Sequence, residues 1–220
     1  MFLGHFGLAF AAKRVAPQVS VGTTIFAAEF LDCVWPVLVI AGVERVEIAP
    51  GITRVTPLDF VHYPWSHSLA MAIAWGAAFA ATYWFLRRKS RDALLLGALV
   101  VSHWLLDWIA HRPDLPLYPG DASRHGLGLW NSLPATMAVE FGMLAAGVYL
   151  YVSCTRARDR TGTIAFWALV AVVVAGYLAA TFGPPPPSSQ AVAWSSLVGY
   201  LLVAWGWWVD RHRESARAMT

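Results

Sequence analysis

Six stretches of about 20 mostly apolar residues restrict the fold of this chain more than any other feature. They cover roughly residues 19–42, 66–86, 92–111, 132–154, 163–182 and 190–209. A helix of about 20 residues rises about 30 Å, the thickness of the hydrocarbon layer of a membrane. Backbone groups in lipid need internal hydrogen bonds, and the stretches lack the alternation of an outer-membrane barrel. The sequence therefore predicts an all-α, polytopic bundle of about six transmembrane helices, forming a single integral-membrane domain over residues 1–220.

The composition also favours a membrane protein. Of the 220 residues, 58% are hydrophobic and only 13% are charged, whereas a soluble domain carries about a quarter charged residues. The net charge of +3 is explained by basic loops beside a membrane, so no nucleic-acid partner is expected. Cys33 and Cys154 lie in different spans, with neither a metal-binding spacing nor a disulfide pattern.

The N-terminal segment, MFLGHFGLAFAAKRVAP, is apolar but shorter than a comfortable span. A signal peptide places its positive charges before the apolar run, whereas Lys13 and Arg14 follow it here. We therefore expect the segment to be retained as a short half-helix that packs against the bundle.

Twelve of the sixteen Lys and Arg residues lie on one side of a six-span bundle. They are Lys13 and Arg14, the basic residues of RRKSR at 87–91 and RARDR at 156–160, and Arg211, Arg213 and Arg217. By the positive-inside rule this side is the cytoplasm. We expect a bacterial-type inner (cytoplasmic) membrane, both termini in the cytoplasm, and a working face built from the long outer loops 43–65 and 112–131.

Several ionisable side chains lie within these apolar segments, where they are energetically unfavourable and usually functional. They are His5 in the half-helix, Glu29 and Asp32 in the first span, His67 in the second, His103 and Asp107 in the third, and Glu140 in the fourth. At about 1.5 Å per residue from the basic ends, all reach a band between the membrane midplane and the outer rim. One buried histidine can be a packing contact, and Asp107 could pair with Arg112, but the shared level favours a common site.

The residue types in this band suit a metal ion. Imidazole nitrogens and carboxylate oxygens are the ligands of catalytic zinc and related ions. His103 and Asp107 are four residues apart and therefore share a helix face. Buried carboxylates also need a compensating positive charge, which a divalent cation supplies. The sequence predicts a site mainly within residues 1–140 for one to three divalent ions, with Zn²⁺ as the first choice.

His111 continues the stripe of His103 and Asp107 toward the outer rim. On a continuous helix it lies about 80° around the axis from His103 and about 12 Å along it. Metal–ligand bonds are only about 2 Å long, so one ion does not comfortably bind both histidines. Arg112 and Pro113 end the helix. We expect His111 to act at the mouth of the site, on substrate or on a second ion.

Several motifs resemble the YdjM-like family of inner-membrane metal-dependent hydrolases. They are GHFGLA, an acidic residue before Pro in the first span, WSHSL, and SHWLLDW followed by PLYP. The resemblance covers about residues 1–120, whereas the two additional spans within 163–209 match only in being hydrophobic. It implies metal binding by His5, Asp32, His67, His103 and Asp107. The chain departs from the family pattern at EFLDCVWP, which holds one Asp with Glu29, and at IAHRPD.

Two functions are compatible with this cluster. Distant similarity of the family to zinc-dependent phospholipase C and single-strand nucleases implies hydrolysis of a phosphoester or lipid-linked ester by metal-activated water at the outer side. The candidate general bases are Glu29 and Glu140, and the candidate substrate-binding residues are Arg112, Arg124, His62 and His125. The partners would be membrane lipid and a lipid or phosphoester substrate. The alternative is a transporter, or a metal- or proton-handling permease. Few polar residues continue from the band toward the cytoplasmic side, which favours the hydrolase.

Overall fold

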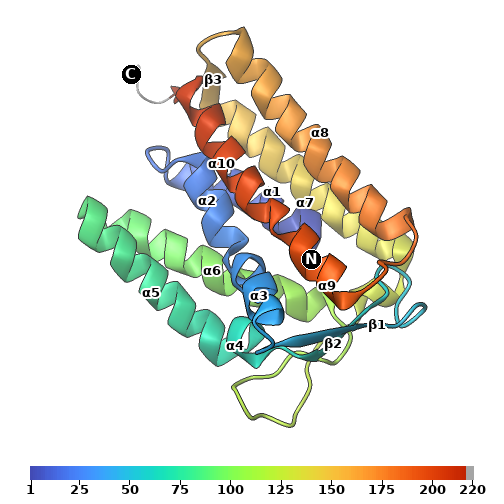
Figure 1. Cartoon of the computed structure of the whole chain (residues 1–220). Coiled ribbons are helices and arrows are strands. Elements are labelled where there is room, and N and C mark those ends of the chain that lie inside the picture. The colour runs from blue at the N-terminus through green and yellow to red at the C-terminus, as the bar shows by residue number, and fades with distance from the viewer. Residues whose placement is uncertain (217–220) are drawn as a thin grey trace.

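Long helices make up most of the chain in the computed structural model, which describes residues 1–216 (Figure 1). Within these described residues, five helical units are long and apolar enough to cross a membrane: α5 (Leu69–Arg87), α6 (Ser90–Ala110), α7 (Leu133–Cys154), α8 (Arg160–Phe182), and α9 (Ser189–Ser196) together with α10 (Val198–Arg211). The predicted all-α helical bundle is confirmed, and its apolar helices indicate a membrane protein. Arg217, from the predicted C-terminal basic group, lies outside the described residues.

The first predicted span, residues 19–42, is a broken helix. It consists of α2 (Val21–Ala28) and α3 (Phe30–Ile40), which are bent by 56° at Glu29. If this pair counts as one span, the described part of the chain has up to six candidate spans. The last carbonyl groups of a helix have no hydrogen-bond partner within that helix. At this break, the carbonyl of Ala28 instead accepts a hydrogen bond from a side chain of another helix.

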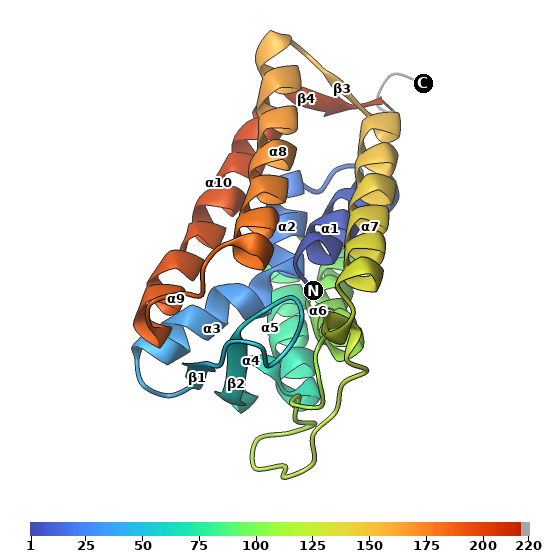
Figure 2. The same ribbon diagram turned by 90° about the vertical axis from the view of Figure 1, so that its right-hand side faces the viewer.

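The predicted half-helix is α1 (Phe2–Val15), which lies inside the bundle against α7 and α2 (Figure 2). Two glycines allow its backbone to touch that of α7. A Cβ atom added to Gly147 would lie 2.1 Å from the carbonyl oxygen of Gly7, so no side chain fits at this position. Small residues that let helix backbones meet are a common packing device in membranes. This contact sets the position of α1.

Two short antiparallel strand pairs lie at opposite ends of the bundle (Figure 2). One pair is β1 (Arg45–Ile48) with β2 (Leu58–His62), and the other is β3 (Thr155–Ala157) with β4 (Arg213–Ser215). The predicted loop 43–65 therefore contains a hairpin, followed by a one-turn helix, α4 (Pro64–His67). Strands this short carry too few residues for an alternating pattern to identify them from sequence. The loop 112–131 carries only a 3₁₀ turn, η1 (Leu129–Asn131), and one bridge, Leu115 to His125.

The predicted basic groups share one end of the bundle. The α1–α2 connection, the α5–α6 turn and the β3–β4 pair all lie there, whereas the β1–β2 hairpin lies at the opposite end (Figure 1). By the positive-inside rule, this basic end is predicted to face the cytoplasm.

Labelling of single cysteines tests this orientation. We expect a membrane-impermeant thiol reagent, added from outside, to modify Ala122→Cys in the outer loop and to spare Lys89→Cys in the α5–α6 turn. Both sites are exposed, and both native cysteines are buried, which keeps the background low. Labelling of Lys89→Cys but not of Ala122→Cys would contradict the proposed orientation and indicate the opposite one.

Candidate metal centre

Five side chains predicted as metal ligands converge beside the break between α2 and α3. They are His5 from α1, Asp32 from α3, His67 from α4, and His103 and Asp107 from α6. The three histidines and Asp107 are at most 3% exposed. The side chain of Asp32 is 45% exposed. The cluster is therefore buried on most sides and open at Asp32.

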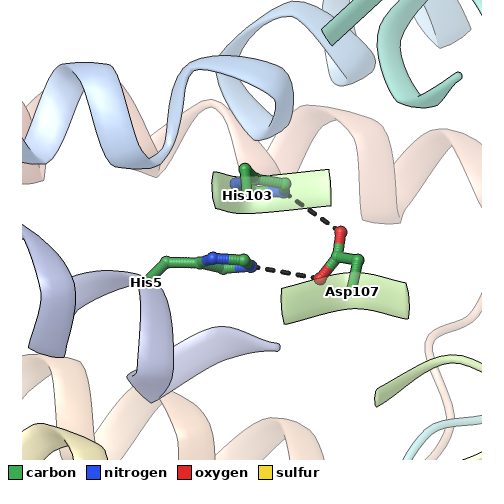
Figure 3. Close-up of side chains that lie close together, drawn as sticks. All are labelled: His5, His103 and Asp107. Carbon is green, nitrogen blue, oxygen red and sulfur yellow. Dashed lines mark hydrogen bonds and ion pairs between the residues drawn. The ribbon is translucent and has the colours of Figure 1, made fainter. Parts of the chain in front are cut away.

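Asp107 is the centre of this cluster. Its Oδ1 lies 3.1 Å from His5 Nε2, and its Oδ2 lies 3.2 Å from His103 Nε2 (Figure 3). His67 Nε2 is 3.7 Å from the same Oδ2, and the amino group of Met1 contacts Oδ1. The rings of His5 and His103 stack, with centroids 3.7 Å apart and planes within 4°. The two carboxylate oxygens therefore face different imidazoles.

Asp32 adds a second carboxylate. Its Oδ1 lies 3.3 Å from His67 Nε2 and 3.7 Å from His103 Nε2. Donor atoms on a tetrahedral ion with bonds of about 2 Å are about 3.3 Å apart. Two groups meet the spacing required of metal ligands: His5 with His103 and Asp107, and Asp32 with His67 and His103. The structure thus contains buried His/Asp groups that can hold a metal ion.

The two ring nitrogens of His103 have different surroundings, and those of Nε2 are compatible with a metal ion. Its Nδ1 lies 2.7 Å from the carbonyl oxygen of Ala28. A carbonyl only accepts hydrogen bonds, so Nδ1 carries a hydrogen, and in the neutral ring Nε2 presents a lone pair. This buried Nε2 has no hydrogen-bond partner within residues 1–216 and faces Asp107 Oδ2, which is also an acceptor. Two facing acceptors repel one another unless a metal ion lies between them or the ring carries a second proton on Nε2.

The Nδ1 nitrogen of His67 is held by two successive hydrogen bonds that lead through Ser66 to Glu44. Its Nδ1 lies 2.7 Å from Ser66 Oγ, and the Ser66 hydroxyl donates to Glu44 Oε2 at 2.6 Å. Because the serine hydrogen points to Glu44, Ser66 Oγ accepts from His67 Nδ1. Glu44 also accepts from the amides of Trp65 and Ser66, both at 2.8 Å. Nothing in the sequence around Glu44 indicates that it is buried, because this depends on the path of the hairpin.

The end of α6 differs from the sequence expectation for His111. The helix stops at Ala110, and His111 has an extended backbone (ψ 148°) rather than a helical one. Pro113 disfavours helix at the residue before it. The spacing predicts His111 at the mouth of the site; in the structure its side chain is buried, with 3% exposure, and lines the cavity. The backbone turn directs the ring back toward Asp107, with Nε2 3.9 Å from Oδ2.

His111 is held from outside by Asp114 and Tyr63, neither of which was predicted from the sequence. Its Nδ1 lies 3.0 Å from Asp114 Oδ1, and the Tyr63 hydroxyl donates to that same oxygen at 2.6 Å. Burial, together with the Asp114 carboxylate, raises the pKa of Tyr63 well above its ordinary value. The hydroxyl therefore keeps its hydrogen at neutral pH.

The two predicted general bases differ in their contacts. Glu140 accepts from the amides of Phe2 and Gly4, at 3.0 Å and 2.8 Å, and so caps the N-terminus of α1. Glu29 is also buried, but its Oε1 has no hydrogen-bond partner in the described part of the chain. Glu29 is therefore the less constrained of the two carboxylates.

The four predicted substrate-binding residues are not brought to the cluster. Arg112 pairs with Asp59 and lies 3.5 Å from Asp114. Arg124 donates to the carbonyl groups of Asp121 and Ser123. The other two are His62, exposed on β2, and His125, whose Nε2 lies 3.0 Å from Ser123 Oγ.

A cavity of about 490 Å³ opens beside the cluster. Its polar lining includes Asp32, His67, Asp107 and His111, together with Glu29 and Glu140. The other lining residues are mainly apolar or aromatic and come from α1, α3, the β1–β2 hairpin and the helices α8, α9 and α10. Among the described residues that line the cavity there is no Lys or Arg. The cavity therefore combines acidic and imidazole side chains with apolar walls.

No protein-family model, curated protein or solved structure matches this chain. Fold and cluster together define an apolar helical bundle of the membrane type, with a buried His/Asp group able to hold a metal ion.

Proposed function

We propose that this protein is a membrane-embedded, metal-dependent hydrolase of the YdjM-like kind, acting on a phosphoester or lipid-linked ester at the outer side of the membrane. The observation that carries the proposal is the opening of the His/Asp cluster onto an apolar cavity. When bound, a divalent cation supplies a water of lowered pKa and charge stabilisation for the ester oxygen. Imidazole with carboxylate is a donor set that suits Zn²⁺.

The residues of the chain have separate tasks in this proposal. His5, His67, His103 and Asp107 hold the metal together with Asp32. Because the two oxygens of Asp107 face different imidazoles, this carboxylate is suited to serve more than one ion. Glu29, which lines the cavity with a buried and unpartnered oxygen, accepts the proton of the attacking water.

The size and lining of the cavity indicate what kind of substrate fits it. A pocket of this volume is typical of small-molecule sites, and its apolar walls suit the hydrocarbon part of a lipid. In this proposal the last helices, α8 to α10, line the part of the cavity that binds the hydrocarbon tail of the substrate. Since no Lys or Arg lines the described cavity, metal rather than Arg112 or Arg124 would bind a phosphate.

The alternative is a transporter that uses the same cluster to carry an ion. A transport path would have to continue from the cluster to the basic end of the bundle. Buried apolar side chains occupy that region instead, among them Phe10, Ile25 and Phe166. Hydrolysis is therefore the function that we favour.

Metal analysis and a panel of phosphoester and lipid substrates test the proposal. We expect wild-type protein to retain zinc and to hydrolyse at least one phosphoester, and His103→Ala to lose both. Zinc affinity should fall by more than about 100-fold, since even changes around metal ligands cost about 10–100-fold. His212→Ala, at the opposite end beside Asp159, is the matched control. Full zinc content in His103→Ala would contradict the site, and zinc flux into vesicles without hydrolysis would favour transport.

A further inference from the structure

Three histidines of the centre share one arrangement of their two ring nitrogens. In His67, His103 and His111, Nδ1 lies against an oxygen outside the cluster, and Nε2 faces a carboxylate inside it. Metal-binding histidines characteristically donate their other N–H to a carboxylate, a carbonyl or a water. His111 fits this pattern through the carboxylate of Asp114, 3.0 Å from its Nδ1.

We infer that His111 is a further imidazole donor of the metal centre, an extension that rests on the proposed function. With its hydrogen on Nδ1, the ring presents the lone pair of Nε2 to Asp107 Oδ2 at 3.9 Å. This is again one acceptor facing another, as at His103. His111 lines the cavity as well, so its Nε2 lies where the metal, Asp107 and substrate would meet.

Asp114 and Glu44 are then positioning residues. Asp114 holds His111 directly, and Glu44 holds His67 through the Ser66 hydroxyl. Both carboxylates are buried, at 5% and 3% exposure. Each fixes the tautomer that leaves Nε2 free, which raises the basicity of the ligand.

A purely structural role for this network predicts different behaviour. Asp114 also accepts from Tyr63 and lies 3.5 Å from Arg112, so it could simply anchor the loop after α6. In that case its loss would lower the stability of the protein and leave zinc affinity unchanged. Zinc affinity and the count of imidazole ligands distinguish the two roles.

The test titrates metal-free full-length protein with Zn²⁺ in competition with a chelator, and counts imidazoles on the bound ion by X-ray absorption. We expect His111→Ala to lose one imidazole and at least about 100-fold in affinity, and Asp114→Asn and Glu44→Gln to lose about 10–100-fold. Matched controls are Asp59→Asn, which removes the other partner of Arg112, and Glu47→Gln on β1. Both should bind zinc as the wild type does.

Each outcome decides one question. If His111→Ala keeps the wild-type affinity and imidazole count, His111 is not a ligand, even though the protein binds zinc. If His111→Ala does not fold, Asp114→Asn decides: unchanged affinity there overturns the inference. Zinc binding by the wild type without hydrolysis of any ester would refute the proposed function alone, and the imidazole count would still apply.

Discussion

Asp107→Asn is expected to abolish metal binding almost completely while leaving the helical bundle folded. Asp107 faces Nε2 of all four histidines of the centre, at distances from 3.1 to 3.9 Å. The variant removes the negative charge and one ligand oxygen together. Since changes beside a ligand already cost about 10–100-fold in affinity, loss of this carboxylate should exceed about 1,000-fold.

Zinc titration and circular dichroism measure the two parts of this result. The matched control is Asp92→Asn, in the first turn of the same helix α6 and outside the cluster. We expect it to bind zinc normally. Wild-type affinity in Asp107→Asn would mean that the imidazoles bind metal without their central carboxylate.

Gly147→Ala is expected to lower the thermal stability strongly and to weaken zinc binding, although Gly147 is not a ligand. The added Cβ would lie 2.1 Å from the carbonyl oxygen of Gly7, and backbone cannot move aside as a flexible side chain can. Overpacking typically costs about 1–3 kcal/mol, and we expect the upper end of this range or more. Because α1 carries His5, its displacement also removes a ligand.

Gly142→Ala is an internal control for this prediction. Gly142 lies on the same helix, and an added Cβ there meets nothing within 4 Å. Alanine is a better helix former than glycine by about 1 kcal/mol, so this variant should be neutral or more stable. Equal melting temperatures for the two variants in detergent would show that α1 does not depend on this contact.

Most of the fold could be predicted from the long apolar stretches of the sequence. The spans and the N-terminal half-helix were predictable because length and hydrophobicity determine them. The five side chains of the cluster could be placed in one band with Glu29 and Glu140, because ionisable residues in apolar segments are rare and counting from the basic ends gives their depth. The choice of these five as ligands came from the motif resemblance.

The surroundings of the cluster could not be predicted in this way. Glu44 and Asp114 lie in polar loops, where an acidic residue is ordinary, and only the course of the chain buries them. Pro113 signals the end of α6, but not that the extended backbone directs His111 back to Asp107. The break at Glu29, which exposes the carbonyl of Ala28 to His103, also has no local signal such as proline or glycine at the bend.

The packing of α1 against α7 has a consequence for biosynthesis. The helix that α1 contacts most extensively, α7, follows every proposed ligand of the centre in the sequence. A chain arrested after α6 holds all the proposed ligands, but α1 can then contact mainly α2 and α6 and lacks its largest contact, with α7. We therefore expect His5 to take its final place beside Asp107 only after α7 has been inserted, so that the proposed metal centre is completed late in synthesis.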